Sequence, residues 1–134
     1  MSQNIVLDLN ELTLEKIQHH FENGDLTSLE LVMYYLDRIS RYDKQGPLIN
    51  SVLEINPHAL FIARNMDVER QNGKVRGPLH GVPVIIKDNI DTADQMHTSA
   101  GSLALENHYA KSDAFLVKKL RDAGAVIIGK ANMT

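Results

Sequence analysis

Two short apolar runs near the carboxyl end of the sequence constrain the fold most. They cover residues 82–86 (VPVII) and 125–129 (AVIIG) and are rich in β-branched side chains. Apolar runs of this length are typical of strands buried on both faces of a parallel sheet. Residues 112–123 have the pattern of an amphipathic helix, and Gly124 follows them. Strand, helix and strand in this order predict a right-handed βαβ unit. The helix positions expected to face mostly inward are Ala114, Phe115, Val117, Leu120 and Ala123.

The preceding part of the sequence predicts helices. Thr13 is a candidate N-cap for a helix that runs to about Glu22, with Gly24 just past its end. Residues 27–30 (TSLE) have the form of a capping box, which predicts the start of a second helix there. The apolar positions of this second helix, expected to lie on one stripe, are Leu29, Val32, Met33, Leu36 and Ile39.

Turn residues divide the rest of this half. The dipeptide at 46–47 (GP) breaks the chain after the second helix, and residues 48–55 are predicted to be extended. Asn56 is expected to cap a third helix that runs to about Gln71. Pro57 suits the first position of that helix, where its missing N–H does no harm.

These elements predict an α/β fold. The expected architecture is a set of N-terminal helices followed by the first βαβ unit of a mixed, largely parallel sheet covered by helices. Residues 1–134 are expected to form part of a single domain. Two strands do not make a stable parallel sheet, because such sheets need further strands and cover on both faces. The sequence therefore predicts an incomplete sheet.

Composition excludes several classes of function. The formal net charge of −3 gives no basic footprint for nucleic acid, and the absence of cysteine excludes disulfides and thiolate catalysis. No apolar run approaches the roughly 18 to 20 residues of a membrane span, and the first residues lack a basic leader. We therefore expect a cytoplasmic protein without membrane or nucleic-acid partners.

Lys87 is the strongest candidate for chemistry. It follows the first apolar run directly and so is expected at the carboxyl end of a buried strand, where α/β folds bind ligands. Partial desolvation there lowers the pKa of a lysine and lets the neutral amine act as a base. The alternative is a lysine that reaches solvent or pairs with Asp88 or Asp91.

Other polar residues are weaker candidates. Residues 98–102 (TSAGS) could shape a pocket or place a hydroxyl beside Lys87, although such residues also favour turns and helix caps. Asn132 could line the same site or cap a following helix. The six histidines show no ligand spacing with carboxylates, so we expect no metal site and no cofactor.

Three consecutive segments resemble the amidase signature family. They are residues 77–90 (GPLHGVPVIIKDNI), 98–105 (TSAGSLAL) and 116–134 (LVKKLRDAGAVIIGKANMT). The earlier helices are similar too, so the resemblance covers nearly the whole chain. The loop at 98–105 and the Ile55-Asn56-Pro57 segment favour the peptide-amidase-like branch over the branch of the tRNA-dependent amidotransferases.

The resemblance implies a serine–serine–lysine hydrolase of carboxamides. In that family the lysine that corresponds to Lys87 takes a proton through a bridging serine, which activates a nucleophilic serine. The implied substrate is a small-molecule or peptide amide, and no cofactor is implied. Both serines lie in a glycine- and serine-rich segment downstream of Thr134, and neither Ser99 nor Ser102 takes their place. We therefore expect a fragment without activity of its own.

Two other hypotheses stay open from the sequence. One is a small adaptor that uses its apolar helix stripes and an exposed sheet edge as a partner surface. The other is a structural segment without a site. The sequence does not predict the oligomeric state.

Overall fold

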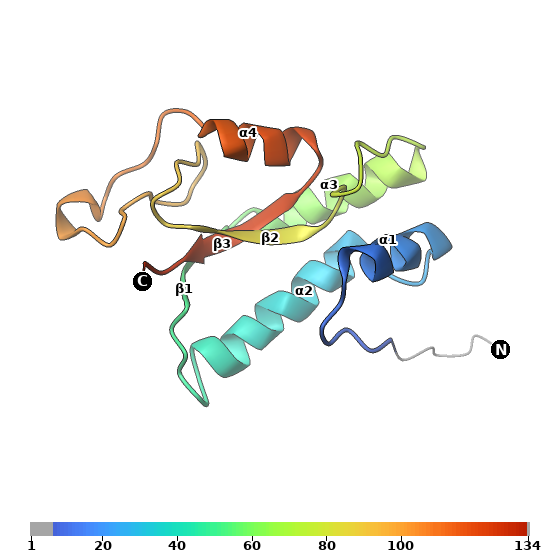
Figure 1. The fold of residues 1–134 in the computed structure, drawn as a ribbon, viewed down its shortest axis with the longest axis horizontal. Helices are drawn as coiled ribbons and strands as arrows, with labels where there is room; N and C mark the ends of the chain where they lie inside the picture. The colour runs from blue at the N-terminus through green and yellow to red at the C-terminus, as the bar shows by residue number, and fades with distance from the viewer. Residues whose placement is uncertain (1–6, 134) are drawn as a thin grey trace.

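A computed structural model describes residues 7–133 and shows a three-stranded sheet with helices on both faces (Figure 1). The strands are β1 (Val52–Ile55), β2 (Pro83–Lys87) and β3 (Val126–Ala131), in the order β1-β3-β2. β2 runs parallel to β3, and β1 runs antiparallel to it. This mixed sheet and its helices confirm the predicted α/β class.

Four α-helices surround the sheet in the part of the chain that the structure describes. They are α1 (Leu14–Asn23), α2 (Ser28–Arg38), α3 (Ala59–Gln71) and α4 (Phe115–Asp122). A π-helical turn, η1 (Ile39–Asp43), extends α2, and a 3-10 turn, η2 (Leu103–Leu105), lies in the long loop before α4. Figure 1 shows α4 on one face of the sheet and α1, α2 and α3 on the other.

The predicted starts of the first two helices are confirmed. The Thr13 hydroxyl accepts a hydrogen bond from the Lys16 N–H at 3.2 Å. The capping box of α2 is complete, because Thr27 Oγ1 accepts from the Glu30 N–H at 3.1 Å and Glu30 Oε2 accepts from the Thr27 N–H at 2.9 Å. Both signals are local in sequence, which explains why the pattern alone predicts them.

The predicted stripe of α2 is partly wrong. Leu31, which the stripe omits, is buried, whereas Met33 is 53% exposed. The reason is that α2 packs in two directions. Leu31 joins a core cluster with residues of α1, while Val32 joins a second cluster with residues of α3 and β3.

The predicted start of α3 is also wrong. The helix begins at Ala59 with His58 as N-cap, two residues after Pro57. Asn56 is bound to the sheet as well, because its Nδ2 donates to the Ile127 carbonyl at 2.8 Å. Its Oδ1 still accepts a local hydrogen bond from the His58 N–H at 3.0 Å, so Asn56 joins the turn before α3 to the sheet.

β3 is the central strand, and β1 and β2 are the two edge strands of the described sheet. Residues 125–129, the predicted buried run, are all buried. The prediction that β2 is buried on both faces is wrong, since Ile85 is 40% exposed. The reason is that Ile85 lines an open groove on its face of the sheet, which the helices on that side leave partly uncovered.

The last helix is shorter than predicted. It begins at Phe115 instead of residue 112, and Phe115 is 75% exposed although the pattern predicted it inward. Val117 is the fully buried residue of α4 and packs on Ile86 and Ile127 of the sheet.

Candidate functional site

Lys87 lies at the carboxyl end of β2, where the sequence predicts it. Its position in the ladder is opposite Ala131 of β3. Exposure alternates along this strand end: Ile85 and Lys87 are exposed, whereas Ile86 and Asp88 are buried. The expectation that Lys87 is partly desolvated is wrong for the described chain. The Lys87 side chain is exposed and projects from the same face of β2 as that of Ile85.

Asp88 is fully buried next to Lys87. Its Oδ2 accepts hydrogen bonds from the Ser99 N–H at 3.2 Å and from the Ser99 hydroxyl. Its backbone N–H donates to the Ala131 carbonyl at 3.0 Å, and its carbonyl accepts from the Ala100 N–H at 3.3 Å. One residue therefore joins the ends of β2 and β3 to the loop at 98–102.

The loop at 98–102 serves mainly to anchor and to turn. The Ser99 hydroxyl donates to Asp88, and the Ser99 carbonyl accepts from the Ser102 N–H at 2.8 Å. Ala100 has a positive φ of 50°, which a tight turn imposes. The structure thus brings this loop to the strand end beside Lys87, with its Ser99 hydroxyl directed to the neighbouring carboxylate.

Lys130 is a feature of this region that sequence reasoning missed. Its side chain is fully buried, and Nζ donates to the Ile90 carbonyl at 2.9 Å, the His97 carbonyl at 3.0 Å and Thr98 Oγ1 at 3.1 Å. Burial lowers the pKa of Lys130, while the negative charge of Asp88 opposes that shift. The signal was available, because a lysine at the end of an apolar run follows the same pattern as Lys87.

A small pocket of about 280 Å³ opens beside this cluster. It is lined by Leu53, Glu54, Asp88, His97, Ser99 and Glu106. The carboxylate of Glu54, in β1, contacts His97 through both oxygens. Oε2 accepts from the His97 backbone N–H at 2.8 Å, and Oε1 lies 3.0 Å from the ring nitrogen Nδ1. Within residues 7–133, Asp88 Oδ1 is the buried side-chain atom that lacks a hydrogen-bond partner.

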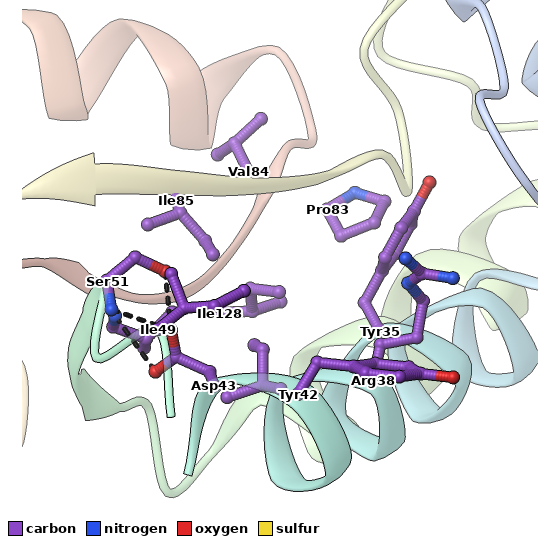
Figure 2. Close-up of a pocket in the computed structure, with 12 residues that line it drawn as sticks. Tyr35, Arg38, Tyr42, Asp43, Ile49, Ser51, Pro83, Val84, Ile85 and Ile128 are labelled. Atoms are coloured by element: carbon purple, nitrogen blue, oxygen red, sulfur yellow. Dashed lines mark hydrogen bonds between the residues drawn. The ribbon is translucent and has the colours of Figure 1, made fainter. Parts of the chain in front are cut away.

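A larger, mostly apolar groove of about 430 Å³ lies between α2, η1 and the sheet. Figure 2 shows Ile85 directed toward Ile49 and Ile128, while Val84 points away from them. Ile85 and Lys87 share the exposed face of β2, so the groove runs along the strand that ends in Lys87. The lining includes a buried carboxylate, Asp43, which accepts hydrogen bonds from Ser51 (Figure 2).

The remaining candidates lie apart from Lys87 or have other partners. Asn132 Nδ2 contacts the Asn50 carbonyl at 3.4 Å, and its Oδ1 accepts from the Met133 N–H at 2.9 Å. His80 is buried, with Nε2 2.8 Å from the Met66 carbonyl. Among residues 7–133, no group of histidine and acidic side chains could hold a metal ion. Within the same part of the chain, no helix is both long and apolar enough to cross a membrane.

Known proteins are similar to this chain over most of its length. The family model described as Amidase matches residues 30–134. The native peptide amidase of Stenotrophomonas maltophilia superposes with a TM-score of 0.89 and 48% identity, over 92% of this chain and 25% of that one. This likeness supports the predicted peptide-amidase-like branch.

Two curated relatives agree. A probable amidase of Arabidopsis thaliana is 44% identical over 128 residues, covering 94% of this chain and 24% of the relative. The A subunit of the glutamyl-tRNA(Gln) amidotransferase of Natranaerobius thermophilus is 39% identical over 127 residues, covering 95% of this chain and 25% of the relative. The chain thus spans about a quarter of the length of the relatives it matches.

Proposed function

This chain belongs to the amidase family, and we propose that the protein it forms hydrolyses the carbon–nitrogen bond of a carboxamide with Lys87 as the base. The observation that supports this role is the position of Lys87 at the carboxyl end of β2, inside the family-matched segment. Ligands bind beyond such strand ends in α/β folds.

The proposed chemistry is acyl transfer by a serine–serine–lysine relay. Neutral Lys87 accepts a proton from a bridging serine, which accepts one from the nucleophilic serine as its oxygen bonds to the amide carbon. The carbon–nitrogen bond then breaks, and the leaving amine takes up the proton. Water hydrolyses the acyl-enzyme by the same route and gives a carboxylate. Both serines are proposed to come from a segment that residues 1–134 do not contain.

The proposed substrate is the terminal carboxamide of a peptide, or a small amide of similar chemistry. The 48% identity to a peptide amidase supports this choice. A second candidate is the amide-hydrolysing component of a tRNA-dependent amidotransferase, which the 39% identity to a protein of that class favours. The first candidate predicts ammonia release from peptide amides without tRNA. The second predicts activity that requires glutamine, partner proteins and a charged tRNA.

Residues 1–134 by themselves are proposed to be inactive and to form the first part of a single amidase domain. The physical reason is that Lys87 is a base without the nucleophile that it activates. A further part of the proposal is a cytoplasmic location.

The test measures ammonia release from a peptide amide by the full gene product, its Lys87→Ala variant and a Lys118→Ala control. Lys118 is an exposed lysine of α4 on the opposite side of the sheet from the groove. We expect Lys87→Ala to lower kcat by about 10³-fold or more, as removal of a triad member does, and the control to match the parent. An unchanged rate for Lys87→Ala would refute the proposed role.

A further inference from the structure

The end of β2 is held by two buried, oppositely charged side chains. Asp88 follows Lys87 in sequence, and Lys130 of β3 is paired in the ladder with Ile86, the residue before Lys87. Both charged side chains are fully buried. Lys87 therefore lies between Ile86, the ladder partner of Lys130, and Asp88, while its own side chain lies on the exposed face.

Each charge fastens the same loop from a different strand. Asp88 holds the backbone N–H and the hydroxyl of Ser99. Lys130 uses its ammonium on the Ile90 carbonyl, the His97 carbonyl and Thr98 Oγ1, at 2.9 to 3.1 Å. Residues 90–99 are thereby tied down across the ends of β2 and β3.

Burying charge is costly, and apolar side chains of similar volume are often more stabilising. The arrangement is therefore better explained by the geometry that it fixes than by stability. The same residue that holds the loop also joins the strands, because the Asp88 N–H donates to the Ala131 carbonyl at 3.0 Å. A shift of Asp88 would move the backbone of Lys87 directly.

We propose that Asp88 is a positioning residue for Lys87, and that its carboxylate, bound to Ser99 of a loop that Lys130 also holds, fixes where the amine of Lys87 is presented. This inference rests on the proposed function. Misplacing a reacting group by about 1 Å can cost about 10²-fold in rate, so such a hold is significant for catalysis.

The test compares Asp88→Ala with Asp91→Asn in the full gene product, with a peptide amide as substrate. Asp91 is an exposed aspartate of the same loop. We expect Asp88→Ala to lower kcat by about 10- to 100-fold with little change in KM, and Asp91→Asn to match the parent. Equal rates for the two variants, with Lys87→Ala inactive, would overturn the positioning role and leave the proposed function intact.

A double variant separates positioning from general damage. Methylamine is added to Lys87→Ala to replace the missing amine, and the same rescue is measured in Lys87→Ala with Asp88→Ala. A free amine is not attached to β2, so we expect the second substitution to cost no further activity. A further loss as large as that in the parent would show that Asp88 acts on the rest of the site, and would overturn the proposal.

Ser99→Ala keeps the inference testable where Asp88→Ala fails to fold, as thermal unfolding would reveal. It removes the hydroxyl donor and leaves the carboxylate and the backbone N–H bond in place. We expect a loss of kcat of about 3- to 10-fold, since one of two hydrogen bonds to Oδ2 is lost. Parent-like kcat in Ser99→Ala would count against the proposal, whereas Lys87→Ala with parent activity would refute the proposed function itself.

Discussion

Gly124 ends α4 in a conformation and a space that other residues do not tolerate. Its φ is +84°, and a Cβ added there would lie 2.7 Å from His80 Nδ1 and 2.9 Å from His80 Cα. Gly24, at the end of α1, has a similar φ of +75° but no described atom within 4 Å of an added Cβ. The two glycines therefore separate backbone strain from steric overlap.

Replacing each glycine by alanine should reveal that difference. We expect Gly24→Ala to lower the free energy of unfolding by about 1 kcal/mol, from the left-handed backbone alone. Gly124→Ala should cost about 3 kcal/mol or more, because overpacking against His80 is added. Urea unfolding of the two variants measures this, and equal losses would show that His80 moves aside freely.

Asp43 links η1 to β1 through a buried carboxylate. Burial by itself raises the pKa of such a group, but hydrogen bonds from Ser51 and Val52 and the nearby Lys44 ammonium lower the pKa of Asp43 to about 2. The ordinary value is 3.8. Because the folded-state pKa is the lower one, the stabilisation is present above about pH 4 and is lost as the pH falls toward 2.

Asp43→Asn should therefore destabilise the protein in a pH-dependent way. We expect a loss of about 2 kcal/mol in the free energy of unfolding at pH 6, and a smaller loss at pH 2, where the parent carboxyl is partly protonated. Asp37→Asn is the control, since Asp37 is half-exposed and its pair with Arg41 lies on the surface. A loss that stays constant between the two pH values would contradict the prediction.

At the scale of elements, the pairing of β1 with β3 depends on Gly129. A Cβ at this position would lie 2.6 Å from the backbone carbonyl oxygen of Glu54 and 3.5 Å from Val52 Cγ1. Backbone atoms of a paired strand cannot swing away as a flexible side chain can. Gly129 therefore lets β1 approach the central strand.

Gly129→Ala should loosen β1 and leave the distant helices folded. We expect faster hydrogen exchange at the Asn56 N–H, which donates to the Ile128 carbonyl at 2.8 Å, while amides of α1 exchange as in the parent. The expected cost is about 2 kcal/mol, typical of a side chain forced into a packed space. Unchanged exchange at Asn56 would show that β1 is held by other contacts.

Elements specified by neighbouring residues were predictable from the sequence, and those specified by distant residues were not. The Thr27–Glu30 capping box lies within one turn, so its pattern is sufficient. Asn56 makes a local bond to the His58 N–H, as a residue near a helix start does, but its second bond, to a strand carbonyl 71 residues away, is not in the pattern. The Lys130 ammonium binds the carbonyls of Ile90 and His97, which lie 40 and 33 residues earlier in the chain, so its burial depends on distant residues. The sequence placed Lys87 correctly at the end of β2. The exposure of its side chain depends on which segments pack against that face of the strand, and the local pattern does not contain them.

At the scale of the whole molecule, β2 presents an unpaired edge and an exposed apolar side chain, Ile85, within residues 7–133. Within residues 7–133, β2 pairs with β3 on one side alone, and Ile85 lies over the apolar groove. Edge strands with exposed apolar residues favour association with other chains. The chain spans about a quarter of its relatives, so the rest of an amidase domain is the proposed cover for this surface. An adaptor would use the same surface for a separate partner.

Ile85→Lys in residues 1–134 tests whether this surface drives association. Sedimentation should reveal self-association of the parent chain at micromolar concentration, and Ile85→Lys should remain monomeric, because a charge at the edge opposes strand pairing. Leu103→Lys is the control, since Leu103 is 85% exposed and lies in η2, outside the groove. In the full gene product the same Ile85→Lys change should lower stability by about 2 kcal/mol or more, since a lysine would then be buried. If Ile85→Lys does not lower the stability of the full gene product, the groove is not covered by the rest of that protein. The adaptor hypothesis requires this outcome.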